Sequence, residues 1–271
     1  MAQPEPMEYA ISASGVTTES QPIEAGSNPK KRKREDPIDN FQEISLTDDH
    51  MVVVCRDEKF QMLAEMALHD AFKRHVIEFD KTCKMGKMEY KRPRGTAFYA
   101  IPTLGGYKYG GVQDIAHNIN DHTAVFNLLT HANQYAGPDK FTGVLLNFYR
   151  SGDDCIALHS DKDVSKDEFL GVLSISLGIT RQLRFENKSD KKGIMDVDKH
   201  HGTILAMCGN GFQDAHKHGM SRHSKKRRER EMTQDSRLYL EHIPQSCTEI
   251  PSGPWHASFT FRRHSKSLKN K

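Results

Sequence analysis

Cysteine is scarce in this sequence, and long apolar runs are absent. The 271 residues include five cysteines, an odd number that lies scattered along the chain without a Cys-x-x-Cys pair. This usage argues against a disulfide framework or a cysteine-based zinc site and favours reduced thiols inside the cell. No apolar stretch approaches the roughly 18 residues that span a bilayer, and the first residues lack a secretory signal pattern. We therefore expect a soluble intracellular protein without a membrane segment.

A dominant charge of one sign is also missing. The net charge is +3 at pH 7, with 28% charged and 36% hydrophobic residues, and it averages strongly basic segments with acidic ones. The charge balance therefore excludes no class of partner, and the length permits one large domain with tails. We expect that domain over residues 46–265, in a monomeric protein with a short basic tail at residues 266–271.

The first 45 residues are rich in Ser, Glu, Pro and Thr and have no apolar period, so we expect them to be disordered. Within them, five consecutive cations run from Lys30 to Arg34. Such a run cannot pack without heavy desolvation, so it stays exposed to partners. It resembles a nuclear localisation signal and predicts a nuclear protein that binds an import receptor. A solvated charge run or a loose nucleic-acid tether is the alternative.

Short segments rich in Val, Leu, Ile and Phe predict strands in the second half of the chain. They cover residues 143–149, 171–177, 181–185, 203–207 and 256–262. Before them, apolar residues at three- and four-residue steps predict one helix from Asp57 to about Val76 and another from Asp121 to about Ala136. Many short strands in succession favour a barrel or a double-sheet jelly roll. We therefore expect a mainly β fold with two helices packed against the outside of a sheet.

The pattern His159-x-Asp161 offers an imidazole nitrogen and a carboxylate oxygen two positions apart. In an extended segment, residues i and i+2 point to the same side, so both can meet one metal ion. His218, 57 positions after Asp161 (218 − 161), is available as a third ligand, and His216 is its rival. Two imidazoles and one carboxylate form the arrangement found in non-haem Fe(II) oxygenases. By itself a His-x-Asp pair is common and more often structural than metal-binding.

The final strand separates its residues into two faces. Alternation places His256, Ser258, Thr260 and Arg262 on one face, with Trp255, Ala257, Phe259 and Phe261 opposite. An inward-facing guanidinium needs an anion, because a buried, unpaired cation costs several kcal/mol. That anion is either a protein carboxylate or a small dicarboxylate bound inside the barrel.

Two further segments each permit two interpretations. The glycine-rich loop around Tyr107-Lys-Tyr109 could stack a base and contact phosphate, or form a hairpin whose tyrosines cover a core. Residues 219–254 form an insertion whose dense cationic run, residues 221–231, is either a phosphate-contacting arm or a solvated loop.

A set of short motifs recurs in order along the chain. They are Pro93-Arg94, Tyr99, Tyr107-x-Tyr109, Asn147-x-Tyr149, His159-x-Asp161-x-Asp163, Ser174-x-Ser176-Leu177-Gly178, Arg181, His201-Gly202-Thr203, Met207, Gln213 followed by His218, and Thr260-Phe261-Arg262. Each is weak alone, but in this order and spacing the set resembles the AlkB family of Fe(II)/2-oxoglutarate dioxygenases, which remove alkyl groups from nucleic-acid bases. The resemblance covers about residues 93–262 and implies a double-stranded β-helix, a relative of the jelly roll.

The resemblance also implies an activity and a site. Fe(II) would be held by His159, Asp161 and His218, with 2-oxoglutarate and O2 as cosubstrates. The residues implied to bind 2-oxoglutarate are Asn147, Tyr149, His256, Ser258 and Arg262, and those implied to hold the substrate base are Tyr99, Tyr107, Tyr109 and Asp163. The implied reaction is oxidative demethylation of N-alkylated bases in DNA or RNA, that is, repair of alkylation damage.

The chain departs from the family at the final strand and after His218. The family usually has Arg-x-Asn before Thr-Phe-Arg, whereas this chain has His256-x-Ser258. A histidine lacks the planar fork with which the missing arginine clamps the distal carboxylate of 2-oxoglutarate, so we expect weaker binding there. The second departure is the long basic insertion. Alternative hypotheses are therefore a catalytically weakened nucleic-acid-binding protein, or an oxygenase that acts on a protein side chain.

Overall fold

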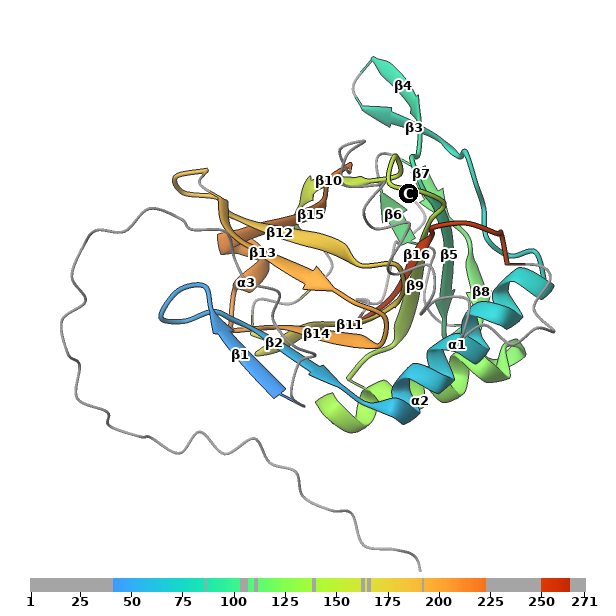
Figure 1. Cartoon of the computed structure of the whole chain (residues 1–271), viewed down its shortest axis with the longest axis horizontal. Coiled ribbons are helices and arrows are strands. Elements are labelled where there is room, and N and C mark those ends of the chain that lie inside the picture. The colour runs from blue at the N-terminus through green and yellow to red at the C-terminus, as the bar shows by residue number, and fades with distance from the viewer. Residues whose placement is uncertain are drawn as a thin grey trace, which may run out of the picture. The chain divides into compact units, whose positions relative to one another are not determined.

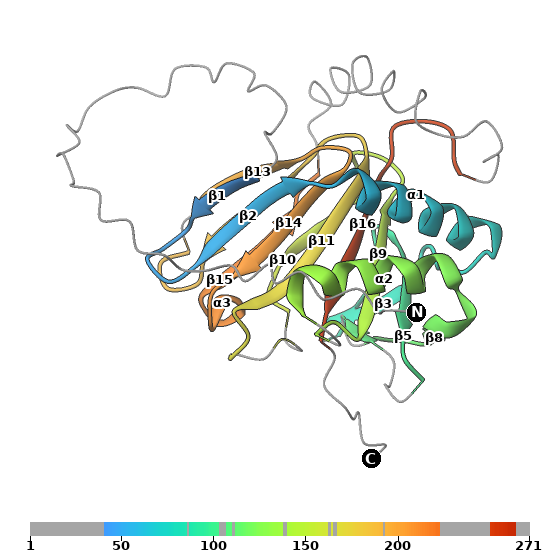
Figure 2. The same ribbon diagram turned by 90° about the horizontal axis from the view of Figure 1, so that it is seen from below.

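The computed structural model describes residues 41–263, except residues 86, 103–106, 110–111, 138–139, 162–163, 165–166, 192 and 223–249. In this part of the chain two β-sheets face each other, and two long helices cover the outer face of the larger sheet (Figures 1 and 2). The fold class expected from the sequence, a mainly β double-stranded β-helix with flanking helices, is confirmed. No helix in the described ranges is long and apolar enough to cross a membrane.

The larger sheet has eight strands. In spatial order they are β1 (Phe41–Ser45), β2 (Met51–Arg56), β14 (Thr203–Cys208), β11 (Leu170–Gly178), β16 (His256–Arg262), β9 (Gly143–Tyr149), β5 (Gly95–Ala100) and β8 (Ala116–Asn118). All neighbours are antiparallel except β5 and β8. The strands β9 and β16 have the bounds that the sequence predicted.

The smaller sheet has four antiparallel strands. They are β10 (Ile156–His159), β15 (His216–Met220), β12 (Arg181–Asn187) and β13 (Gly193–Lys199). Two hairpins stand apart from both sheets and comprise β3 (Thr82–Met85) with β4 (Met88–Lys91), and β6 (Tyr107–Tyr109) with β7 (Val112–Asp114). A short helix, α3 (Phe212–Ala215), leads into β15.

The two long helices form where the apolar period predicted them. Helix α1 (Glu58–Lys73) begins at Asp57, whose carboxylate accepts a hydrogen bond from the backbone N–H of Phe60 at 2.9 Å, as an N-cap does. It ends three residues before the expected Val76. Helix α2 (Thr123–Ala136) follows the short 3-10 helix η1 (Ile119–Asp121) and stops at Gly137, whose φ of +99° is left-handed.

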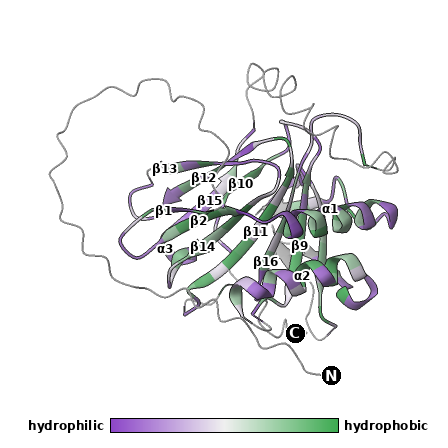
Figure 3. Ribbon diagram, turned by 60° about the horizontal axis from the view of Figure 1, so that its bottom comes forward, coloured by the Kyte–Doolittle hydropathy of each residue, from purple (hydrophilic) through white to green (hydrophobic). Residues whose placement is uncertain are grey.

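The larger sheet buries both of its faces, with different chemistry on each. Its outer face packs Ala257, Phe259 and Phe261 of β16 under α1 and α2, in a core that also takes residues from β5, β9, β11 and β14. Figure 3 shows that the central strands are largely hydrophobic, whereas the helices mix hydrophobic and hydrophilic residues. The inner face of β16 carries polar side chains, including His256 and Arg262, and both are buried. The alternation predicted for this strand is confirmed.

Tyr149 of the larger sheet packs on Ile156 and Met220 of the smaller one, but most apolar packing between the two sheets lies in another region. It joins residues of the larger sheet to Leu183, Phe185 and Val197 of the smaller one, with Phe212 of α3 beside them. The remaining space between the sheets is lined by polar and charged groups. Such a division leaves a polar interior at one side of the barrel, where a small charged ligand can be held.

Two boundaries differ from those expected. Residues 41–45 were assigned to a disordered tail but form β1, because an edge strand is held by backbone hydrogen bonds to β2 and needs little apolar pattern. Gly219 and Met220 were assigned to the insertion but end β15, and the Met220 side chain packs against Tyr149 and Ile156. Residues 1–40, 223–249 and 264–271 lie outside the described residues, so the basic run from Lys30 to Arg34, the basic arm and the final tail stay predictions.

Candidate metal centre

His159 and His218 lie 59 positions apart in the chain (218 − 159) but face each other across two paired strands. They are register partners in the antiparallel pair of β10 and β15, and their ring centroids are 4.5 Å apart. Directly opposed residues in such a pair project to the same face of the sheet. The strand pairing therefore joins two imidazoles that the sequence leaves far apart.

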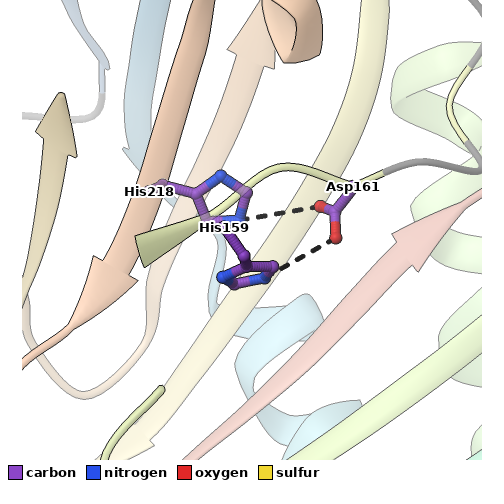
Figure 4. Close-up of side chains that lie close together, drawn as sticks. All are labelled: His159, Asp161 and His218. Carbon is purple, nitrogen blue, oxygen red and sulfur yellow. Dashed lines mark ion pairs between the residues drawn. The ribbon is translucent and has the colours of Figure 1, made fainter. Parts of the chain in front are cut away.

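Asp161 completes the cluster from just beyond the end of β10. Its Oδ1 lies 3.8 Å from Nε2 of His159, and its Oδ2 lies 3.6 Å from Nε2 of His218 (Figure 4). One ligand atom from each of the three residues lies within 4.8 Å of the others. Two imidazole nitrogens and one carboxylate oxygen, gathered this closely, can hold one divalent ion on one side and leave its other positions open.

Hydrogen bonds around the cluster fix these side chains. Nδ1 of His159 donates to the carbonyl of Ala157 at 2.9 Å, which leaves Nε2 directed toward Asp161. The backbone N–H of Asp161 donates to Oε1 of Gln213 on α3 at 2.9 Å, and the hydroxyl of Ser160 donates to the carbonyl of His216 at 2.7 Å. The segment after β10 is therefore tied to both α3 and β15.

The charges of the cluster are balanced inside the protein. Burial alone would raise the pKa of Asp161, but the positive charge of Arg262, with smaller contributions from the two neighbouring imidazoles, outweighs it and lowers the pKa to about 2. Nη1 of Arg262 donates to Oδ1 of Asp161 at 2.6 Å. Burial lowers the pKa of His159 and lowers that of His218 to about 3. At neutral pH the set is one carboxylate and two neutral imidazoles, the forms that bind a metal.

The rival histidine points elsewhere. The ring of His216 packs edge-on against His50 at 4.9 Å and lies 5.0 Å from the ring of Phe212. Burial lowers its pKa to about 4. The cluster that the structure assembles contains His218 and not His216.

The residues expected to bind 2-oxoglutarate meet on the inner face of the larger sheet. Tyr149 and Asn147 of β9 are register partners of His256 and Ser258 of β16, and all four side chains are buried. The rings of Tyr149 and His256 are 5.9 Å apart. Nδ1 of His256 donates to the carbonyl of Ile179 at 2.8 Å, which directs Nε2 away from that backbone. Arg262, the fifth expected residue, continues the same face toward Asp161.

Of the expected base-binding residues, Tyr99 is the one whose side chain lies in the described part of the chain. Tyr99 is the register partner of Val144, so it faces the helix-covered core, where its ring lies 5.0 Å from that of His122. The structure therefore does not bring Tyr99 to the metal cluster, because β5 turns this residue to the outer face. Tyr107 and Tyr109 form β6, but their side chains lie outside the described atoms, as does the whole of Asp163.

A cleft of about 520 Å³ opens at the metal cluster. His159, Asp161 and Gln213 line it, together with two cations on its walls, Lys188 and Lys217. Nζ of Lys188 donates to the carbonyl of Gln213 at 2.7 Å, and Lys217 pairs with Glu186 at 3.9 Å. Glu168 and Asp214 also line the cleft, so the path from solvent to the cluster carries charges of both signs.

Two buried cations near the cluster were not identified from the sequence as site residues. Nε of Arg94 donates to Oδ1 of Asn147 at 2.7 Å and so orients the amide. Nζ of Lys199 donates to the hydroxyl of Ser174 at 3.0 Å, from the opposite sheet. The alternation of Met195, Val197 and Lys199 would have indicated an inward lysine, had the strand at residues 193–199 been recognised.

A match to one protein family covers more than half of the chain. Residues 59–241 match the family model of the 2OG-Fe(II) oxygenase superfamily. The chain is 22% identical over 123 residues to the DNA oxidative demethylase ALKBH2 of Arabidopsis thaliana, a match that takes in 45% of this chain and 39% of that protein. A solved structure of OsALKBH1 is 19% identical, with a TM-score of 0.49, over 82% of this chain and 100% of that one.

Proposed function

This chain belongs to the 2OG-Fe(II) oxygenase superfamily, and we propose that it is a dioxygenase of the AlkB family that removes alkyl groups from bases in DNA or RNA. The observation that carries the proposal is the cluster of His159, Asp161 and His218, whose ligand atoms lie within 4.8 Å of one another. The order of AlkB-like motifs along the chain and the similarity to a DNA oxidative demethylase support the choice of substrate class.

The residues present fit the iron and the cosubstrate that the family uses. Two neutral imidazoles and one carboxylate would hold Fe(II) at His159, Asp161 and His218. Asn147, Tyr149, His256, Ser258 and Arg262 would bind 2-oxoglutarate, which is a dicarboxylate and suits a polar interior that contains buried cations. With O2, the bound iron and cosubstrate would supply the oxidation that releases an N-methyl group as formaldehyde, yielding succinate and CO2 as coproducts.

The role of the protein's own side chains is to hold the metal ligands and the cosubstrate-binding residues in position. Arg262 holds the Asp161 carboxylate in its charged form, so the ligand set exists before the metal arrives. Arg94 fixes the Asn147 amide, and Gln213 fixes the backbone at Asp161. Burial of these groups excludes water from the reacting centre.

The substrate would reach the centre through the cleft beside His159 and Asp161. Lys188 and Lys217 on its walls would attract the phosphates of a nucleic acid. A base within a duplex must be flipped out to reach a buried metal, at a cost of a few kcal/mol that is lower for damaged or single-stranded substrate. Tyr107, Tyr109 and Asp163, with the basic segment at residues 221–231, are the elements we assign to holding it.

The test is release of formaldehyde from oligonucleotides that contain 1-methyladenine or 3-methylcytosine, by the full-length protein with Fe(II), 2-oxoglutarate and O2. We expect formaldehyde and succinate in equal amounts, and neither from Asp161→Asn. Asp196→Asn, at a half-buried carboxylate of β13 paired with Arg184, is the matched control and should retain activity. A wild-type protein that binds iron and 2-oxoglutarate but leaves both oligonucleotides unchanged would exclude the proposed substrate class.

The replacement of arginine by His256 supports a second candidate, a catalytically weakened protein that binds nucleic acid without turnover. Succinate formation separates the two candidates, because binding without succinate favours the second. Succinate formation together with salt-insensitive, weak binding to oligonucleotides would favour oxidation of a protein side chain instead.

We also propose that the protein acts in the nucleus, in DNA repair, as a monomer. The cations from Lys30 to Arg34 support import through an acidic groove of an import receptor. A fluorescent fusion that lacks residues 29–36 should lose nuclear accumulation. If the deleted fusion accumulates in the nucleus as the intact one does, this segment is not the signal.

A further inference from the structure

Lys199 is a buried lysine without a carboxylate partner in the described part of the chain. It is the last residue of β13, and its side chain crosses from the smaller sheet toward the larger one. The residue is 3% exposed, and Nζ donates to the hydroxyl of Ser174 at 3.0 Å. A buried ammonium that is not paired with an anion is costly.

The surroundings of Lys199 are polar and incompletely satisfied. Ser174 and Ser176 of β11 are register partners of Thr260 and Ser258 of β16, so they lie on the inner face that carries the expected cosubstrate residues. The hydroxyl of Ser176 is buried without a hydrogen-bond partner, and so is that of Thr203 on β14. These hydroxyl groups and the ammonium of Lys199 can together bind an anion that has several acceptor oxygens.

We propose that Lys199 is the cation that pairs with the distal carboxylate of 2-oxoglutarate, in place of the arginine that this chain lacks at position 256. The inference rests on the proposed function, because it takes 2-oxoglutarate as the cosubstrate. The cation that pairs with the distal carboxylate would then come from β13 of the smaller sheet, whereas in the AlkB-like motifs it comes from the last strand of the larger sheet.

The distribution of charge favours this assignment over one to His256. Arg262 is already paired with Asp161 at the metal end of the inner face. Nδ1 of His256 is engaged by the carbonyl of Ile179, so at most one nitrogen of that ring can donate to a ligand. Lys199 has three N–H donors on one ammonium, of which one contacts Ser174.

Lys199 also lies close enough to the metal cluster for one small ligand to join the two. Its positive charge contributes to the lowered pKa of His218. It reaches Ser174, whose register partner Thr260 stands two positions before Arg262 and two after Ser258. A ligand with one end at the metal and Arg262 would extend along this face past Thr260, within reach of an ammonium at Ser174.

The test measures binding by calorimetry, with the full-length protein loaded with Mn(II) so that no turnover occurs. The variant is Lys199→Met, which keeps the length of the side chain and removes the charge. The ligands are 2-oxoglutarate and 2-oxopentanoate, which has the same chain without the distal carboxylate. We expect Lys199→Met to weaken 2-oxoglutarate binding by at least about tenfold and to change 2-oxopentanoate binding by less than about twofold.

Further variants separate a charge pair from a structural role. Lys73→Met changes an exposed lysine at the end of α1 and should bind both ligands as the wild type does. Lys199→Arg should retain most of the preference for 2-oxoglutarate. His256→Arg added to Lys199→Met should restore it, because an arginine there supplies the missing cation from the last strand of the larger sheet.

The inference is overturned if Lys199→Met and the wild type bind 2-oxoglutarate equally, or if the variant loses both ligands to the same degree. It is also overturned if the wild type has no preference for 2-oxoglutarate over 2-oxopentanoate. Unchanged affinity for Mn(II) shows that the variant is folded at the metal centre. The proposed function fails in a different way, by intact 2-oxoglutarate binding without release of formaldehyde from methylated oligonucleotides.

Discussion

The interior between the two sheets holds two buried groups of opposite charge, Asp161 and Lys199, which differ in their partners. At the metal centre, Asp161 is buried beside Arg262 at 2.6 Å, and that guanidinium, with smaller contributions from the two neighbouring imidazoles, lowers its pKa to about 2. Lys199 is buried with a hydroxyl as its contact, and burial lowers its pKa to about 7. The fold stabilises the charge of Asp161, whereas the charge of Lys199 destabilises the folded protein.

Asp161 is held ready to bind a cation, whereas Lys199 lacks an anion. A carboxylate held by Arg262 keeps its position and charge whether or not a metal is bound, which is preorganisation. A lysine without a counter-ion gains stability only when an anion arrives, so its cost in the free protein becomes affinity for the ligand. The four predictions below test this contrast.

Asp161→Asn should have the largest effect, since it removes one of three metal ligands and leaves Arg262 buried without its anion. We expect the affinity for Mn(II) or Fe(II) to fall by more than about 100-fold, measured by calorimetry. Asp196→Asn, at the half-buried carboxylate of β13 paired with Arg184, is the control and should bind metal normally. Retention of full metal affinity by Asp161→Asn would place the metal elsewhere.

Lys199→Met should stabilise the ligand-free protein, and the gain should depend on pH. Burial lowers the folded-state pKa of Lys199 to about 7, below the 10.5 of an ordinary lysine. The unfolded state therefore binds more protons between these values, and wild-type stability rises as the pH increases from about 7 to 10.5. The full cost of the buried charge is present below pH 7, where the variant should be more stable by on the order of a few kcal/mol. Urea unfolding at pH 6, 8 and 10 measures this.

One result of the unfolding measurement would contradict an unpaired Lys199. If Lys199→Met is no more stable than the wild type at pH 6, the ammonium is already paired in the free protein. The gain should also shrink when 2-oxoglutarate and Mn(II) saturate the wild type, because the ligand then supplies the missing anion.

Gly219→Ala should disturb the metal end by a smaller amount. A Cβ at this position would lie 2.9 Å from both the carbonyl oxygen of Ile156 and the backbone nitrogen of Leu158, so β10 would have to shift away from β15. Because that pairing aligns His159 with His218, we expect about tenfold weaker metal binding and a loss of ~1–3 kcal/mol in unfolding free energy. Lys217→Ala, on the same strand, should bind metal with wild-type affinity. Equal affinities for the two variants would contradict the role of the strand register.

Arg184→Gln should have the smallest effect, although it breaks an ion pair with two good hydrogen bonds. The guanidinium contacts both oxygens of Asp196 at 2.8 Å, but it is 52% exposed. Solvent screens such a pair, so we expect a change in unfolding free energy of less than ~1 kcal/mol and unchanged metal and 2-oxoglutarate affinities. A larger loss would mean that exposure is a poor guide to the value of an ion pair, including that of the buried Arg262–Asp161 pair.

Local patterns in the sequence were sufficient for several parts of the fold. The strands at residues 143–149 and 256–262 were predicted with the observed bounds, because apolar alternation and flanking turns define them locally. The start of α1 at Asp57 followed from its capping side chain. Strand β13 was missed, since a sequence that ends in Asp198 and Lys199 is typical of a solvent-exposed segment.

The sequence by itself determined which residue types were available for the chemistry: the His159-x-Asp161 pair, the polar face of the last strand, and the substitution of His256 for an arginine. Only the tertiary structure decided which of them meet. The register of β10 with β15 chose His218 over His216, β5 turned Tyr99 to the outer face, and the facing of the two sheets brought Lys199 to Ser174. Contacts between distant segments depend on strand register and sheet packing, which are properties of the whole barrel and leave no local pattern in the chain.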